Sequence, residues 1–257
     1  GTLHTVSAGA FCASISGGRH NVIKRNANNA NIGGGRENSV YRSFAAIAGG
    51  KSNKAWGKYS IVGGGLSNSA RGSSASVLGG EANFVDGYSS VIVGGGVLDS
   101  SNRNVIVGNH SFIGSGLRNI VSAHLSAILG GSDNSAAANA VTIAGGQWNS
   151  AFGAHSAVLG GKLNMAEGTC SAVVGCNGTA TSANSAVLSF TQAGCLDKGE
   201  GSVHACVSSG FFVNDVNVGE SIANASSEVN ALNRAMAAVE TDIVSLNQTH
   251  QAINVVV

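Results

Sequence analysis

Basic side chains gather at the start of the chain together with two aromatic residues. Residues 1–71 hold nine Lys and Arg and one acid, Glu37, whereas residues 72–257 hold five basic and twelve acidic residues. Such a charge balance attracts acidic or sulfated glycans, lipopolysaccharide or an acidic protein patch, although a merely solvated surface explains it equally well. The candidate ligand-binding residues are Arg19, Lys24, Arg25, Arg36, Tyr41, Lys51, Lys54 and Trp56.

Other chemistry finds little support in the residue types and spacings. The seven His residues show no metal-ligand spacing with Cys or carboxylates, and no GxxxxGK[ST] phosphate loop occurs. A calcium-binding roll would need Asp where Asn recurs, and no nucleic-acid-binding motif is present. We therefore expect no enzyme activity, no metal, no cofactor and no nucleic-acid partner. The acids that could act in pairs are scattered: Glu37, Glu81, Asp86, Asp99, Asp133 and Glu167.

The five cysteines leave the redox compartment open. Cys195 and Cys206 flank an expected hairpin and could form a disulfide, while Cys170 and Cys176 are close enough in sequence for a local bridge. Free thiols explain the same residues equally well.

These residues are carried by a repeat of about fifteen residues, which is typical of a solenoid. A β-branched residue is followed six positions later by Asn or Asp, usually within a GGxxN pattern. We expect the glycines to supply backbone angles closed to other residues and the Asn to adopt the left-handed region. The turn residues are Asn21, Asn38, Asn53, Asn68, Asn83, Asp99, Asn119, Asn134, Asn149 and Asn164, and the β-branched residues are Ile15, Ile32, Ile47, Val62, Val77, Val93, Ile113, Ile128, Ile143 and Val158.

Each repeat is expected to hold two short strands whose side chains alternate between core and surface. Residues such as Ala45 and Ile47 on the first strand, and Ala55 on the second, should point inward. The outward positions of the first strand carry no charge, so we expect this face to pack against copies of the chain. Its apolar members include Ile61, Leu78, Ile92, Phe112, Leu129 and Leu159. The second strand presents a variable outward column to solvent: Lys24, Tyr41, Trp56, Arg71, Asp86, Asn102, Ser122, Ala137, Phe152 and Glu167.

The C-terminal residues follow a different period. From Ile222, apolar residues alternate by three and four positions through Val229, Leu232 and Met236 to Val257. This narrow seam predicts a coiled coil, and we expect three parallel chains.

Three runs carry a resemblance to a known family: SAILGGSDNSA (126–136), TIAGGQWNSAFGAHSAVLGG (142–161) and SIVGGGLSNSARGSSASVLGG (60–80). They resemble the head repeats of trimeric autotransporter adhesins, the YadA-like β-roll. Similar repeats occur in fibre and spike proteins of bacteriophages and large algal viruses. The resemblance implies a left-handed parallel β-roll and a trimer whose head joins a coiled-coil stalk through a neck. The chain departs from the family in its repeat length and in its GGxxN turn.

The expected fold class is an all-β solenoid, a left-handed parallel β-roll of about 12 turns. It should occupy residues 1–190, followed by neck strands at 191–220 and a trimeric coiled coil at 221–257. The expected function is a non-enzymatic surface fibre, spike or adhesin that attaches to a host cell or surface. The alternative is an architectural fibre that docks neighbouring proteins of a virion or cell surface. Both place the chain outside the cell, with copies of itself and an acidic glycan or host receptor as partners and without insertion into a membrane.

Overall fold

The computed structural model describes residues 3–97, 102–191, 193–207, 212–213, 216–217, 224–234, 236–237 and 240–241. The chain divides into two compact units, Gly1–Cys206 and Val207–Val257.

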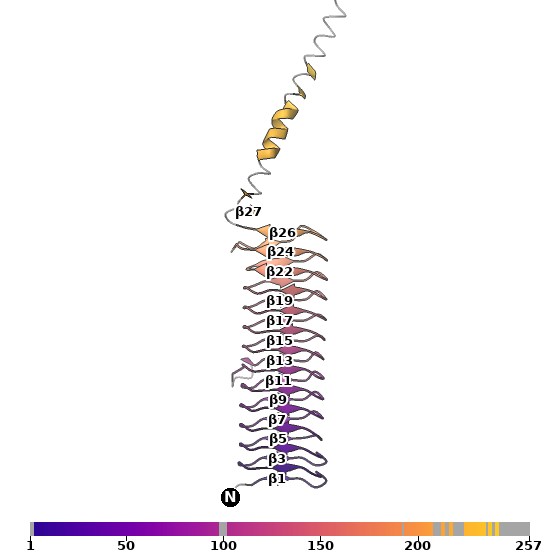
Figure 1. Cartoon of the computed structure of the whole chain (residues 1–257), viewed down its shortest axis with the longest axis vertical. Helices are drawn as coiled ribbons and strands as arrows, with labels where there is room; N and C mark the ends of the chain where they lie inside the picture. Colours follow the sequence, from indigo (N-terminus) through magenta and orange to yellow (C-terminus); the bar gives the residue numbers. More distant parts are fainter. Residues whose placement is uncertain are drawn as a thin grey trace, which may run out of the picture. The chain divides into compact units, whose positions relative to one another are not determined.

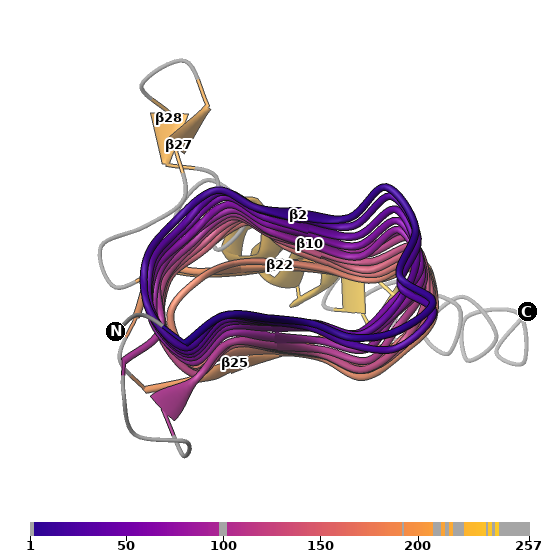
Figure 2. The same ribbon diagram turned by 90° about the horizontal axis from the view of Figure 1, so that it is seen from below.

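The first unit is a parallel β-solenoid, as Figure 1 shows, and its described residues form thirteen coils. Each coil gives one short strand to each of two 13-stranded parallel sheets, which we call sheet A and sheet B. Seen along the axis in Figure 2, the coils superpose and the two sheets face each other. The all-β parallel solenoid with repeats of about fifteen residues is therefore confirmed.

The strands of the two sheets alternate along the chain. Sheet A holds β1 (Thr5–Val6), β3 (Val22–Ile23), β5 (Ser39–Val40), β7 (Lys54–Ala55), β9 (Ser69–Ala70), β11 (Phe84–Val85), β13 (Val105–Ile106), β15 (Ile120–Val121), β17 (Ser135–Ala136), β19 (Ser150–Ala151), β21 (Met165–Ala166), β23 (Gly178–Ala180) and β25 (Cys195–Leu196). Sheet B holds β2 (Ser14–Ile15), β4 (Asn31–Ile32), β6 (Ala46–Ile47), β8 (Ile61–Val62), β10 (Ser76–Val77), β12 (Val91–Ile92), β14 (Phe112–Ile113), β16 (Ala127–Ile128), β18 (Thr142–Ile143), β20 (Ala157–Val158), β22 (Ala172–Gly175), β24 (Ala186–Ser189) and β26 (Val203–Cys206).

The core consists of small and β-branched side chains stacked in register. Ile32, Ile47 and Val62 pair in succession on sheet B and are fully buried. Ala45 and Ala55, also expected inside, are buried as well. Because every coil repeats the same inward positions, the core is a continuous column that each coil extends.

One coil differs from the expected register. Asp99 lies outside the described residues, and Asn104 occupies the recurring Asn position, 21 residues after Asn83. The extra residues follow strand β12, in which Ile92 pairs with Ile113 and is buried. The inward position therefore belongs to Ile92, and the prediction that Val93 points inward was wrong, since Val93 is exposed. Asn102, expected on the outer face of the second strand, instead accepts a hydrogen bond from Arg118.

The recurring Asn has a different role from the one expected, whereas the glycine before the intervening pair has the expected left-handed backbone, as at Gly50 with φ 84°. The left-handed residue is the one before the Asn, such as Glu37 with φ 61° or Ser52 with φ 58°. The Asn itself is buried and bonds to two coils: Asn53 Nδ2 donates to Gly49 O and Gly65 O, both at 3.0 Å. The prediction that Asn supplies the left-handed conformation was therefore wrong. Its side chain ties successive coils together.

The solenoid continues beyond residue 190. Strands β25 and β26 pair in register with β23 and β24, so residues expected in the neck form the last coil. Cys195 and Cys206 form a disulfide between the two sheets rather than across a hairpin, with Cα atoms 5.7 Å apart. Cys170 and Cys176 are free and exposed. They precede and follow strand β22, whose extended backbone keeps them apart.

The described residues of the second unit form a short strand pair and a helical segment. Strands β27 (Phe212–Val213) and β28 (Val216–Asn217) pair antiparallel. Residues 224–234, 236–237 and 240–241 are helical, and the apolar seam residues Val229, Leu232 and Met236 are exposed. The rest of the heptad pattern lies outside the described residues, so the coiled coil stays a prediction. No described helix combines the length and apolar character needed to cross a bilayer.

Candidate anion-binding groove

The predicted ligand-binding residues fall mainly into two columns of the solenoid. Arg19, Arg36 and Lys51 occupy one position of successive coils and are joined by parallel bridges at a corner between the sheets. Lys24, Tyr41 and Trp56 occupy successive outward positions of sheet A, with Lys54 two residues before Trp56. Arg25 follows Lys24 toward the opposite corner and is exposed. The structure therefore unites seven of the eight residues on one corner and the sheet beside it.

The aromatic residues of this column stack on one another. The rings of Tyr41 and Trp56 lie 3.5 Å apart at an interplanar angle of 8°, and Lys24 Nζ is 5.7 Å from the Tyr41 centroid. Because adjacent coils are spaced at the ordinary strand distance of about 4.8 Å, flat side chains in the same column meet face to face. The Trp56 ring therefore covers one face of the Tyr41 ring, whereas the Trp56 side chain itself remains 38% exposed.

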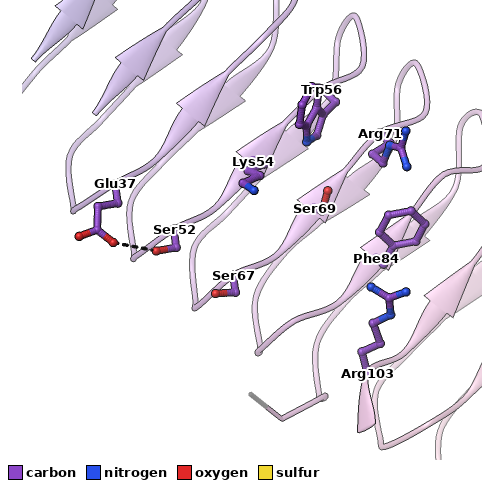
Figure 3. Close-up of a pocket in the computed structure, with 9 residues that line it drawn as sticks. All are labelled: Glu37, Ser52, Lys54, Trp56, Ser67, Ser69, Arg71, Phe84 and Arg103. Carbon is purple, nitrogen blue, oxygen red and sulfur yellow. Dashed lines mark hydrogen bonds between the residues drawn. The ribbon is translucent and has the colours of Figure 1, made fainter. Parts of the chain in front are cut away.

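A groove of about 620 Å³ opens on sheet A beside this stack, and Figure 3 shows its lining. Lys54, Ser69 and Phe84 lie in register on strands β7, β9 and β11. The small Ser69 leaves space between its larger neighbours. The lining residues are Glu37, Ser52, Lys54, Trp56, Ser67, Ser69, Arg71, Phe84 and Arg103.

Two guanidinium groups flank the Phe84 ring. Arg71 Cζ lies 5.6 Å and Arg103 Cζ 4.8 Å from its centroid. Cation–π contacts of this kind orient the side chains while leaving their N–H donors available for a ligand. Arg71 also lies 3.7 Å from the carboxylate of Asp86, and the side chains of both are about half exposed. Solvent screens such an exposed pair, so a bound anion can compete for Arg71.

A single acid stands at one end of the groove. Glu37 Oε2 accepts a hydrogen bond of 3.0 Å from Ser52 Oγ, drawn in Figure 3, and its Oε1 lies 3.2 Å from Arg36 Nε. Among the lining residues, Lys54, Arg71 and Arg103 provide three cations against this one carboxylate, while Asp86 pairs with Arg71 from outside the lining. The groove combines positive charge, two aromatic rings and serine hydroxyls, which together suit an anion with hydroxyl groups and a flat apolar face.

Sequence reasoning identified only part of this groove. Lys54 and Trp56 belong to the predicted set, but Arg71, Phe84 and Arg103 do not. Arg71 belongs to the outward column three residues after the recurring Asn, which the sequence predicts. Phe84 belongs to a further outward column, one residue after the Asn, which the sequence analysis did not consider. Arg103 could be found only with the correct register, because it directly precedes Asn104.

A second group of side chains also departs from the sequence-based expectation. One ligand atom from each of Cys195, His204 and Cys206 lies within 4.8 Å of the others. The fold thus places His204 beside two cysteine sulfurs, a proximity that the sequence analysis did not anticipate. The spacing of His204 and Cys206 by two residues on one strand was the available signal.

The outer face of sheet B has a different character. Its outward columns contain no Lys, Arg, Asp or Glu on any described strand. Apolar side chains are exposed along it, among them Ile61, Leu78, Leu129 and Leu159. Ile92, expected in this set, points inward for the register reason given above.

No protein-family model matches the chain, and no curated protein matches it.

Proposed function

We propose that the chain is a non-enzymatic, extracellular surface fibre that binds anionic carbohydrate through the groove on sheet A. The observation that carries the proposal is the placement of Arg71 and Arg103 on either side of Phe84, with Lys54 and Trp56 across Ser69. A sulfate or carboxylate accepts hydrogen bonds from two guanidinium groups, and a sugar ring packs its C–H face on an aromatic ring. The exposed cations Arg19, Arg36 and Lys51 extend the positive charge along the neighbouring corner.

We propose further that three copies assemble in parallel through sheet B, as left-handed rolls of the kind seen in YadA-like heads. The uncharged outer face of sheet B and the exposed seam residues of the helix support this assembly. Apolar side chains left on the surface of one chain are stabilised when another copy covers them. A trimer would present three grooves outward, and multivalent contact strengthens a weak individual interaction.

An architectural fibre is the second candidate, and the same sheet B face favours it. In this case the uncharged surface docks neighbouring structural proteins of a virion or cell surface, and the groove on sheet A is only a solvated surface. The two candidates differ in whether isolated protein binds an anionic polysaccharide.

Binding to immobilised polysaccharides separates the two candidates. The probes are heparin as a sulfated chain, polygalacturonate as a carboxylated chain and dextran as a neutral chain. We expect the full-length protein to bind at least one anionic chain and not dextran, with an affinity that falls as salt rises. The double change Arg71→Gln and Arg103→Gln should weaken binding by at least about tenfold, because charged hydrogen bonds are lost.

A matched control uses a cation–aromatic pair outside the groove. Lys162 Nζ lies 4.8 Å from the Trp148 centroid, and Lys162→Gln should leave polysaccharide binding unchanged. Unchanged melting temperatures would show that all variants keep the fold. Equal binding by wild type and by the double variant, or no preference for anionic chains, would refute the attachment role and favour the architectural one.

A further inference from the structure

The last coil of the solenoid places three soft metal ligands together at the end of its core. Cys195 lies on β25 of sheet A, whereas His204 and Cys206 lie on β26 of sheet B. His204 pairs in register with the buried Val187, and Cys206 pairs with the buried Ser189. The inward column of Val158, Val173 and Val187 therefore ends in His204.

Among the described coils, His204 is the only polar residue in this inward column, and every other member is Ile or Val. The Cys195 side chain is buried, and His204 and Cys206 are partly buried, so the three groups are shielded but can be reached from solvent. Their ligand atoms lie within 4.8 Å of one another. A tetrahedral zinc ion with Zn–S of about 2.3 Å and Zn–N of about 2.1 Å holds its ligands about 3.7 Å apart. The two sulfurs are bonded in the disulfide, so they must separate to about this distance after reduction.

We propose that Cys195, His204 and Cys206 bind one Zn²⁺ when the disulfide is reduced. A phosphine reductant takes up one oxygen from water and converts the S–S bond to two thiols. Zinc then binds both sulfurs and one His204 nitrogen and displaces two thiol protons to solvent. Water completes the four-coordinate set. In either redox state a covalent or coordinate link joins sheet A to sheet B and holds the last coil closed.

The test compares zinc binding by the oxidised and reduced full-length chain. The exposed free cysteines Cys12, Cys170 and Cys176 are replaced by Ser in both samples, so that their thiols do not compete. Zinc is measured after dialysis, and cobalt(II) is then used as a spectroscopic probe. We expect one zinc per chain in the reduced sample and none in the oxidised one. Cobalt should give thiolate charge-transfer bands and the intense visible bands of tetrahedral coordination.

The histidine is tested separately. His204→Ala should weaken zinc binding by at least about tenfold, whereas His155→Ala, at an exposed corner, should leave it unchanged. The redox comparison requires no substitution at the site, so it remains informative if His204→Ala fails to fold. Absence of zinc from the reduced chain, equal zinc in the oxidised chain, or unaltered affinity in a folded His204→Ala variant would overturn the proposal.

Discussion

At the scale of the residue, the recurring Asn is the main polar link between coils. Asn68 is fully buried, and its Nδ2 donates to Gly64 O at 2.9 Å and to Gly80 O at 2.8 Å. Its Oδ1 accepts a hydrogen bond of 3.0 Å from the Asn83 amide. An amide side chain is required because the position needs both a donor and an acceptor.

Asn68→Ala should therefore lower the free energy of unfolding by about 2–4 kcal/mol, because it leaves the buried Asn83 amide without a partner. The matched control is Asn139→Ala. Asn139 is exposed and accepts one bond of 3.0 Å from the His124 amide, so its loss should cost about 1 kcal/mol or less. Chemical denaturation of both variants measures the difference, and equal losses would contradict the structural role given to the buried Asn column.

Asp197 is a second residue of interest, because its hydrogen bonds should make the stability of the fold depend on pH. Its buried carboxylate accepts hydrogen bonds from Thr181 N and Thr181 Oγ1, both at 2.8 Å, and from Ser182 N at 3.1 Å. Burial opposes ionisation, but the hydrogen bonds from Ser182 and Thr181 outweigh it and hold the pKa of Asp197 well below its ordinary value.

A pKa that is lower in the folded than in the unfolded state stabilises the fold above the unfolded value and loses that contribution as the pH falls. Wild-type stability should therefore decrease below about pH 4. Asp197→Asn should be less stable than wild type at neutral pH, and the difference should shrink in acid. Denaturation across this range provides the measurement, with Asp86→Asn as the exposed control. A stability difference that does not change with pH would contradict the role of the charge.

At the scale of the element, the adjacent glycines Gly64 and Gly65 of one turn are not equivalent. Gly65 has φ +86°, and an added Cβ would lie 2.1 Å from Gly80 O of the next coil. Gly64 has an ordinary backbone conformation, and an added Cβ would meet nothing within 4 Å. In this turn only the second glycine is required by conformation and by close approach between coils.

Gly65→Ala should consequently destabilise the chain by about 3 kcal/mol or more, because it combines backbone strain with a clash against a carbonyl. Gly64→Ala should change stability by less than about 1 kcal/mol. The two melting temperatures give a comparison between neighbouring residues with the same substitution. Similar losses would mean that the coils are not stacked in the register described above.

At the scale of the whole molecule, the two outer faces of the solenoid predict different effects of an added charge. Leu129 on sheet B is 52% exposed and Phe152 on sheet A is 48% exposed, so the two side chains are matched in accessibility. If copies pack through sheet B, Leu129→Glu places a charge in the interface, where it lacks a partner. Phe152→Glu places it in solvent.

Sedimentation velocity should give a trimer for wild type and for Phe152→Glu, and smaller species for Leu129→Glu. Circular dichroism checks that both variants keep the β structure. A monomeric wild type, or a trimer that both substitutions leave intact, would rule out sheet B as the contact surface.

The sequence alone determined the repeat, the two strands of the regular coils and the inward residues of those coils. Ile47, Ala55 and Val158 were assigned correctly because a β-strand alternates its side chains with a period of two and the repeat length is nearly constant. Because the pattern recurs in many coils, one irregular repeat does not hide it. The solenoid class can therefore be predicted from the sequence alone.

Only the tertiary structure decided the features that depend on contacts between coils. Extra residues after β12 moved the Asn position from Asp99 to Asn104, and strand pairing, not local pattern, placed Ile92 inside. In sheet A, the pairing of β11 with β9 and with β13 brought Arg71, Phe84 and Arg103 into one groove. Cys195 and Cys206 met because consecutive strands belong to opposite sheets. Within regular coils a sequence pattern predicts which face a side chain takes, whereas the register between coils decides which side chains become neighbours and corrects the face where a coil is irregular.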